Sequence, residues 1–98
     1  METQKVIWTN TAKNQLKEIY QYYKKITPKG ATNVKNDILK ASRELVFIKQ
    51  SQQDEIEPEF RRIIVRHYKL IYTIENQTIY ILRIFDTRQN PAKQKKQE

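Results

Sequence analysis

Hydrophobic and polar positions along the chain follow two different periods. Near the start, the short apolar stretch KVIWT is rich in β-branched residues and predicts a first β-strand. From residue 12 to residue 26, apolar side chains recur every three or four positions, which describes one face of an α-helix. Thr9, Asn10 or Thr11 can cap the start of this helix. A second run with the same spacing covers residues 31–48 and predicts a second amphipathic helix.

The segment between the two helical patterns is TPKG, which holds a proline and the only glycine of the chain. It predicts a short turn, so the two helices should form an antiparallel hairpin. The polar, acidic segment KQSQQDEIEPE follows the second helix and is expected to be a loop.

The next segment, FRRIIVRHYKLIYTIENQTIYILRIFDT, is dense in Ile, Val, Tyr and Phe and contains no Gly or Pro, which favours strands. ENQT predicts a turn, and a break near Arg66 and His67 separates a further strand. The resulting order is β-α-α-β-β-β. It predicts an α+β domain in which an N-terminal strand, a helical hairpin and an antiparallel meander combine, with the helices covering one face of the sheet.

A two-residue loop at Asn76 and Gln77 would fix the pairing of the last two strands. The opposite pairs would be Tyr72–Ile81, Leu70–Arg83 and Lys69–Ile84. Both faces of this strand pair are then largely apolar, as in the centre of a sheet. A slip of one residue would exchange the faces.

Ninety-eight residues make one domain, without a visible repeat. The last stretch, QNPAKQKKQE, has almost nothing to bury. We therefore expect a single domain over residues 1–90 and a flexible basic tail over residues 91–98.

The charge is unevenly distributed. The chain has 19 Lys and Arg against 11 Asp and Glu, a net charge of +8, and residues 61–98 supply most of the excess. Such a field attracts nucleic acids or acidic protein surfaces. A simpler role in solubility is the alternative.

Several classes of function are disfavoured by composition. With no cysteine there is neither a disulfide nor a thiol nucleophile, and with one histidine a zinc site is not expected. No Gly-rich phosphate loop, HExxH motif or nucleophile elbow is present, so neither a metal nor another cofactor is indicated. No apolar run approaches the ~20 residues of a membrane span, and METQKVIWTN has no apolar core of a signal peptide. We expect a cytoplasmic protein without a membrane partner.

Basic side chains lie within or at the ends of the predicted strands, where a compact sheet could gather them on one concave surface: Arg61, Arg62, Arg66, His67, Lys69, Arg83 and Arg88. Guanidinium groups bind phosphate oxygens in a bidentate fork and stabilise the charge of a pentacoordinate transition state. Nearby tyrosines could stack on bases, although packing in the core is the simpler interpretation. His67 is a candidate general acid or base, or a turn residue without chemistry.

The layout resembles the RelE/ParE family of toxins from bacterial type II toxin–antitoxin systems. The resemblance lies in VIWTNTAKNQLKEIYQYY, in FRRIIVRHYKLIYTIENQTIYILRIFDTRQNP and in the helical hairpin between them, and it covers residues 4–91. Its most specific part, YKLIY…IYILRIFDTRQNP, is similar to the ParE branch and to plasmid-stabilisation proteins.

The resemblance implies two activities on one fold. RelE-like members are ribosome-dependent endoribonucleases that cleave mRNA without a metal. ParE-like members inhibit DNA gyrase. Members of both kinds are neutralised by a cognate antitoxin protein. The chain is therefore expected to be a growth-inhibiting toxin that acts on gyrase; a ribosome-dependent mRNA endoribonuclease and a non-toxic, basic nucleic-acid-binding module are the alternatives.

The resemblance also suggests residue roles. Lys69 and Arg88 match positions of catalytic arginines in RelE, and Arg62 falls approximately where RelE has a catalytic lysine. The family's C-terminal tyrosine would fall near Gln94, and no Tyr or His follows Tyr80, so the ribonuclease set is incomplete. If the chain is a ribonuclease, the candidate catalytic residues are Arg62, His67, Lys69 and Arg88. The candidate target-binding residues are Arg61, Arg62, Arg66, Arg83 and Arg88. Arg88 is expected to be a functional surface residue rather than a simple ion-pair partner of Asp86.

Overall fold

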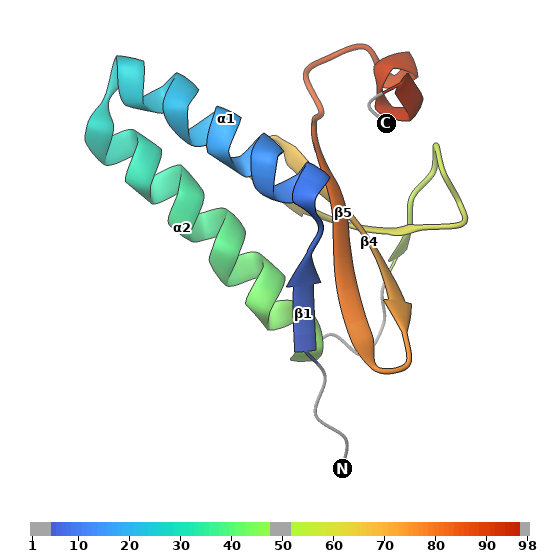
Figure 1. Ribbon diagram of the computed structural model, residues 1–98. Helices are drawn as coiled ribbons and strands as arrows, with labels where there is room; N and C mark the ends of the chain where they lie inside the picture. Colours follow the sequence, from blue (N-terminus) through green and yellow to red (C-terminus); the bar gives the residue numbers. More distant parts are fainter. Residues whose placement is uncertain (1–4, 48–51, 97–98) are drawn as a thin grey trace.

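The computed structural model describes residues 5–47 and 52–96, which fold into two helices and a five-stranded sheet. Strand β1 (Lys5–Trp8) leads directly into helix α1 (Asn10–Ile26), and α2 (Pro28–Glu44) returns beside it (Figure 1). The α+β class and the helical hairpin predicted from the sequence are confirmed.

Two threonines define the ends of the helices. Thr9 caps α1, since its Oγ1 accepts a hydrogen bond from the backbone N–H of Ala12. Thr27 is an extended residue that ends α1 by donating its N–H to the carbonyl of Tyr23, and its side chain accepts from the N–H of Gly30 in α2. One residue therefore makes the whole turn, and Pro28 begins the second helix, where a missing N–H costs nothing.

The sheet has the order β1-β5-β4-β3-β2. Strand β1 lies at one edge and runs parallel to β5 (Thr78–Asp86), which pairs in antiparallel fashion with β4 (Tyr68–Glu75). Strand β3 (Arg61–Val65) extends the meander, and β2 (Gln52–Gln53) adds a two-residue strand to the segment that was predicted to be a loop.

The second helix ends earlier than its apolar pattern predicted. Helix α2 stops at Glu44, and a 3-10 turn, η1 (Leu45–Phe47), follows it. Leu45 lies at the next position of the apolar spacing and is buried, so the apolar pattern of α2 continues into the 3-10 turn. Ile48, the last residue of the predicted run, lies outside the described residues.

The turn between β4 and β5 lies where the sequence placed it. Asn76 and Gln77 both have positive φ, 49° and 66°, as a two-residue hairpin of the right twist requires. Pairing starts as predicted, with Tyr72 opposite Ile81.

The predicted register is wrong beyond that point. A β-bulge displaces the ladder by one residue, so that Leu70 pairs with Ile84 and Lys69 with Phe85. The extra residue moves Ile84 to the face that also carries Leu70, and Arg83 to the other.

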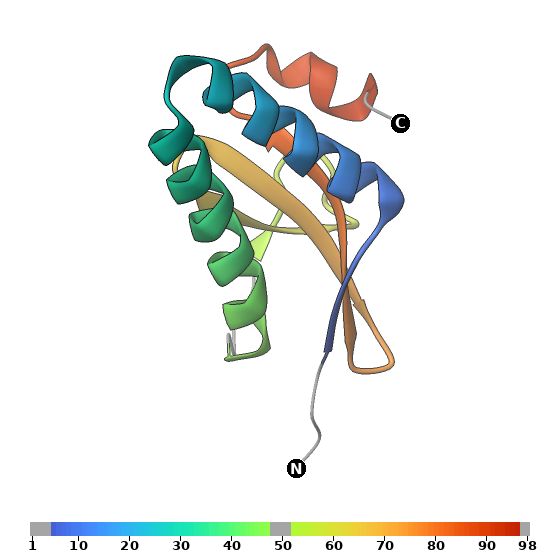
Figure 2. The ribbon, with the colours of Figure 1, turned by 60° about the vertical axis from the view of Figure 1, so that its left-hand side comes forward.

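The helices cover only one face of the sheet (Figure 2). Two adjoining clusters of buried side chains fill the space between: Leu16, Val34, Ile38, Tyr68, Leu70 and Ile84 in the first, and Ala12, Leu45, Tyr72, Ile79 and Ile81 in the second. Tyr68 and Tyr72 are thus core residues rather than exposed stacking platforms. The opposite face of the sheet is covered by the 54–60 loop and by a C-terminal 3-10 helix, η2 (Pro91–Lys96), which appear on its right in Figure 1.

Candidate functional site

Three basic side chains lie together on the sheet face that the helices leave uncovered. In the ladder, Ile71 of β4 has Arg62 of β3 on one side and Arg83 of β5 on the other. Lys69 lies two positions before Ile71 on the same strand and therefore on the same face. We call Arg62, Lys69 and Arg83 the sheet-face cations.

The acidic loop after β2 neutralises these cations. Lys69 Nζ lies 2.7 Å from Asp54 Oδ1, and Arg83 donates to Glu57. The side chains of the Lys69–Asp54 pair are 5% and 0% exposed, and those of the Arg83–Glu57 pair are 6% and 4% exposed. Both pairs are therefore internal to the protein. The more exposed Glu55 lies 3.4 Å from Lys69 and 3.6 Å from Arg62.

Gln94 of η2 completes this network. Its Nε2 donates to Asp54 Oδ2 and to Glu57 Oε1, both at 2.7 Å, and its Oε1 accepts from Lys69 Nζ at 2.9 Å. The side chain is fully buried. The first part of the predicted tail is thus placed in a helix against the sheet, because a neutral amide satisfies two carboxylates and an ammonium group at once.

Hydrogen bonds keep the carboxyl groups of Asp54 and Glu57 ionised. Burial alone would raise the pKa of Asp54, but hydrogen bonds from Lys69, Gln94 and the backbone N–H of Glu57 outweigh it, and the pKa lies below its ordinary value. In the same way, Arg83 and Gln94 overcome the burial of Glu57 and lower its pKa. At neutral pH the network therefore consists of charged pairs.

A second cluster lies at the end of the sheet where β3 turns into β4. His67 Nε2 is 3.4 Å from the hydroxyl of Tyr23 on α1, and its ring contacts the ring of Tyr68 at a centroid distance of 4.2 Å. Burial, aided by the nearby charges of Arg88 and Arg66, lowers the pKa of His67. The imidazole is therefore mostly neutral at pH 7 and able to accept a proton.

Arg88 lies beside this cluster and is exposed. Its guanidinium group binds both carboxylate oxygens of Asp86, at 3.1 and 3.0 Å. These hydrogen bonds lower the pKa of Asp86 and raise that of Arg88. Both residues border a cavity of about 400 Å³ with mixed lining, whose other residues include Gln15, Glu18, Tyr22 and Tyr68.

The basic residues predicted to line one concave surface do not do so. Arg61 precedes Arg62 on β3 and lies on the opposite face, whereas Arg66 pairs with Asp37 of α2 at 2.7 Å. Lys69 and Arg83 are buried and lie with Arg62 on the sheet face opposite the helices, whereas Arg88 and His67 belong to the separate cluster at the end of the sheet. Asp54, Glu57 and Tyr23 were not predicted as site residues, and Gln94 was named only as the position near which the family's tyrosine would fall, since no local pattern connects these residues to their partners.

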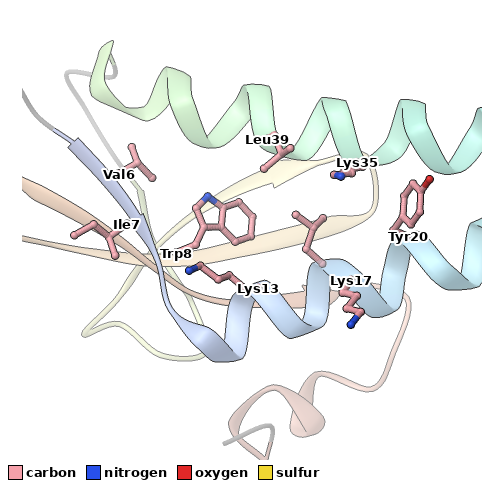
Figure 3. A pocket seen from close by; sticks show the side chains of 9 residues that line it. Val6, Ile7, Trp8, Lys13, Lys17, Tyr20, Lys35 and Leu39 are labelled. Atoms are coloured by element: carbon pink, nitrogen blue, oxygen red, sulfur yellow. The ribbon is translucent and has the colours of Figure 1, made fainter.

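A third feature is an apolar groove of about 660 Å³ beside β1 (Figure 3). Trp8 of β1 and Leu39 of α2 point into it, and Tyr20 of α1 lines its far end from Trp8. Three lysines, Lys13, Lys17 and Lys35, stand around it, with Lys35 Nζ 5.3 Å above the Tyr20 ring. The groove runs beside the edge strand of the sheet.

No set of three or more His, Asp or Glu side chains in residues 5–47 and 52–96 is arranged to hold a metal ion. Within the same residues, no helix has the length and apolar character that crossing a membrane requires.

Comparison with known proteins agrees with the fold. The family model described as the ParE toxin of the type II toxin–antitoxin system, parDE, matches residues 6–91. This chain belongs to that toxin family. It is the toxin component of a type II toxin–antitoxin system.

Two solved structures are similar to it. One, of a chromosomal ParDE toxin–antitoxin system from P. aeruginosa, has 22% identity and a TM-score of 0.76, covering 85% of this chain and 95% of that one. The other, the toxin–antitoxin complex RelBE2 from Mycobacterium tuberculosis, has 22% identity and a TM-score of 0.54, covering 87% of this chain and 99% of that one. No curated protein gives a significant sequence match.

Proposed function

We propose that this toxin inhibits DNA gyrase by binding it, without chemistry of its own, and that a cognate antitoxin neutralises it. The observation that supports this choice is the state of the sheet-face cations. Lys69 and Arg83 are buried and paired with Asp54 and Glu57, so their charges are not available to stabilise a phosphate group during RNA cleavage. Inhibition by binding alone does not require these two cations.

The groove beside β1 is a suitable site for the antitoxin. Its apolar lining would accept the hydrophobic face of an amphipathic segment, and its three lysines would pair with acidic side chains on that segment. The adjacent edge of β1 is unpaired in the described sheet and offers backbone groups as well. The partner expected from this chemistry is a short, acidic, amphipathic chain.

The gyrase proposal is tested by a supercoiling assay with the purified toxin and gyrase from the same organism. Inhibition of supercoiling, together with trapped cleaved DNA, is expected. Addition of the protein encoded by the adjacent reading frame should restore supercoiling. Full gyrase activity at a large molar excess of toxin would contradict the proposal.

The antitoxin site is tested by reversing charges around the groove. Lys13→Glu combined with Lys35→Glu should weaken binding of the adjacent-frame protein by about 10-fold or more, because two attractions become repulsions. Lys29→Glu combined with Lys40→Glu reverses two exposed lysines of α2 outside the groove lining; it is the matched control and should change affinity little. Equal effects of both changes would show a non-specific charge effect instead.

The cluster around His67 favours ribosome-dependent RNA cleavage as the second candidate. A mostly neutral imidazole, a tyrosine hydroxyl at 3.4 Å and the exposed Arg88 nearby are groups that proton transfer and phosphate binding would use. His67→Gln separates the candidates. Growth arrest should persist with this variant if the target is gyrase, and should be lost, together with mRNA cleavage on the ribosome, if the chain is a ribonuclease.

A further inference from the structure

The turn that joins α1 to α2 is strongly basic. Residues 19–36 contain four lysines and neither aspartate nor glutamate. Lys24 and Lys25 lie in the last turn of α1 and Lys29 in the first turn of α2, and all three are exposed. Figure 1 shows this turn at the end of the helical hairpin that lies away from β1. A positive charge without acids between the lysines attracts an acidic surface.

Two large apolar side chains are exposed beside these lysines. Tyr22 is 59% exposed and Ile26 is 64% exposed. They are four positions apart in α1 and therefore lie on one face of the helix, one turn apart. Thr27 alone makes the turn into α2, so the connection has no longer loop that could cover Ile26. Exposed apolar side chains with a charged rim are the arrangement found in protein interfaces.

The ring of Tyr22 is held by the residue that follows it. It packs edge-on against the ring of Tyr23, with 5.3 Å between the centroids and 86° between the planes. The hydroxyl of Tyr23 in turn lies 3.4 Å from Nε2 of His67. An aromatic ring that is already held in place loses little conformational entropy on binding. Tyr22 also lines the cavity of about 400 Å³ that Arg88 borders, so this end of α1 is continuous with the arginine expected to bind the target.

We propose that the hairpin tip, formed by the exposed side chains Tyr22, Lys24, Lys25, Ile26 and Lys29, docks on the target protein of the toxin. The partner that fits is an acidic protein surface with an apolar hollow, which accepts Tyr22 and Ile26 and pairs with the lysines around them. This docking role rests on the proposed function, inhibition of gyrase by binding. The five side chains lie outside the lining of the groove beside β1.

An anionic membrane is the other surface that basic and apolar side chains suit. The cavity beside Tyr22 argues against it, because the carboxyl-bearing residues Glu18 and Asp86 also line that cavity and repel anionic headgroups. A helix that lies on a membrane buries a whole apolar face. Helix α1 exposes two large apolar side chains, Tyr22 and Ile26. A protein surface therefore fits the hairpin tip better.

Removal of the apolar pair tests the docking role in the full-length toxin. Tyr22→Ala combined with Ile26→Ala should weaken binding to gyrase from the same organism by about 10-fold or more in surface plasmon resonance, because interface energy is concentrated in such anchors. Alanine is the best helix former, so α1 should persist, which circular dichroism and the unfolding midpoint check. The matched control is Phe47→Ala combined with Ile74→Ala, which removes two exposed apolar side chains outside the hairpin tip and should leave the affinity unchanged.

Reversal of charge tests the lysines of the tip. Lys25→Glu combined with Lys29→Glu should weaken gyrase binding by about 10-fold at low salt and by less at high salt, because two attractions become repulsions that salt screens. Lys40→Glu combined with Arg43→Glu reverses two exposed cations towards the other end of α2 and changes the net charge equally. Equal weakening by the two pairs would overturn the docking role, since positive charge at any place would then suffice.

Vesicles of phosphatidylglycerol test the membrane alternative. The unmodified toxin should not sediment with them at about 0.15 M salt. Sedimentation that Tyr22→Ala with Ile26→Ala abolishes, while gyrase inhibition is retained, would overturn the docking role in favour of a lipid surface.

The unmodified toxin separates failure of the docking role from failure of the proposed function. If it inhibits gyrase and Tyr22→Ala with Ile26→Ala inhibits equally, the docking role is overturned and the gyrase proposal stands. If it leaves gyrase unaffected, the gyrase proposal fails, and growth arrest then decides the docking role without knowledge of the target. Growth arrest lost with this pair and kept with Phe47→Ala and Ile74→Ala would support docking by the tip, and growth arrest kept with both pairs would overturn it.

Discussion

Gln94 and Asp54 are 40 positions apart in the chain, and Nε2 of Gln94 lies 2.7 Å from Oδ2 of Asp54. The other oxygen of the same carboxylate accepts a hydrogen bond from Lys69 on the central strand β4. One aspartate therefore joins the C-terminal helix, the acidic loop and the sheet. Because these groups are buried, losing one partner changes the energy of the others.

Lys69→Met should strongly destabilise the protein. It leaves the fully buried Asp54 without its cation, which typically costs about 3–5 kcal/mol. Combining it with Asp54→Asn should recover most of this loss, because no uncompensated buried charge remains. Urea unfolding measures both changes, and Lys40→Met on the exposed surface of α2 should stay within about 0.5 kcal/mol. A fully stable Lys69→Met protein would show that the pair is open in solution.

Acid should destabilise the fold through Asp54 and Glu57. Their pKa values in the folded protein lie below the ordinary 3.8 and 4.5 that the unfolded chain regains. The stability that they contribute is therefore complete above those values and is lost as pH falls through the lower folded-state values. The contribution of these two groups to the free energy of unfolding should be level from pH 7 to about 5 and decline below pH 4.5.

Chemical-shift titration of the side-chain carboxyl carbons assigns this acid effect to its residues. Asp54 and Glu57 should each titrate below its ordinary value, 3.8 and 4.5 respectively. Titration of both groups at or above their ordinary values would contradict the charged network.

Gln77→Gly should stabilise the hairpin between β4 and β5. Gln77 has φ of 66°, a left-handed conformation that glycine adopts without strain. Relief of this strain exceeds the added entropy of the unfolded chain, so a gain of about 0.5 kcal/mol in unfolding free energy is expected. Thr73→Gly within β4 is the control and should destabilise. A loss of stability with Gln77→Gly would mean that the Gln77 side chain makes a compensating contact.

Arg88→Ala should abolish growth arrest while leaving the unfolding midpoint unchanged. The side chain is 61% exposed and its bond to Asp86 spans only two residues, so the core does not depend on it. Lys40→Ala removes one exposed positive charge elsewhere and should leave growth arrest intact. Growth arrest that survives Arg88→Ala would exclude Arg88 from target binding.

Much of the fold follows from local patterns in the sequence. The three- and four-residue spacing of apolar side chains within residues 12–26 and 31–48 predicted the helical faces, and Leu16, Val34 and Ile38 on these faces are in the core. The hairpin loop at Asn76 and Gln77 was also correct, because two polar residues between apolar strands allow few other turns.

Tertiary structure decided which face each strand residue uses. Both faces of β4 and β5 are largely apolar, so the sequence carries no alternation that marks the bulge near Ile71 and Tyr72. That single extra residue brings Arg83 onto the face with Lys69 and sends Ile84 to the helices. The sheet face that a basic residue of an apolar strand occupies can be assigned only when the neighbouring strands are placed.

The candidate site shows the same limit. The sequence by itself determined the class of protein, the element order and the surplus of positive charge. It did not determine that Lys69 and Arg83 would be neutralised, because their partners Asp54, Glu57 and Gln94 lie 15 to 26 positions away in the chain. Ion pairs and hydrogen bonds depend on distances of a few ångströms in space, and only the folded chain sets those distances.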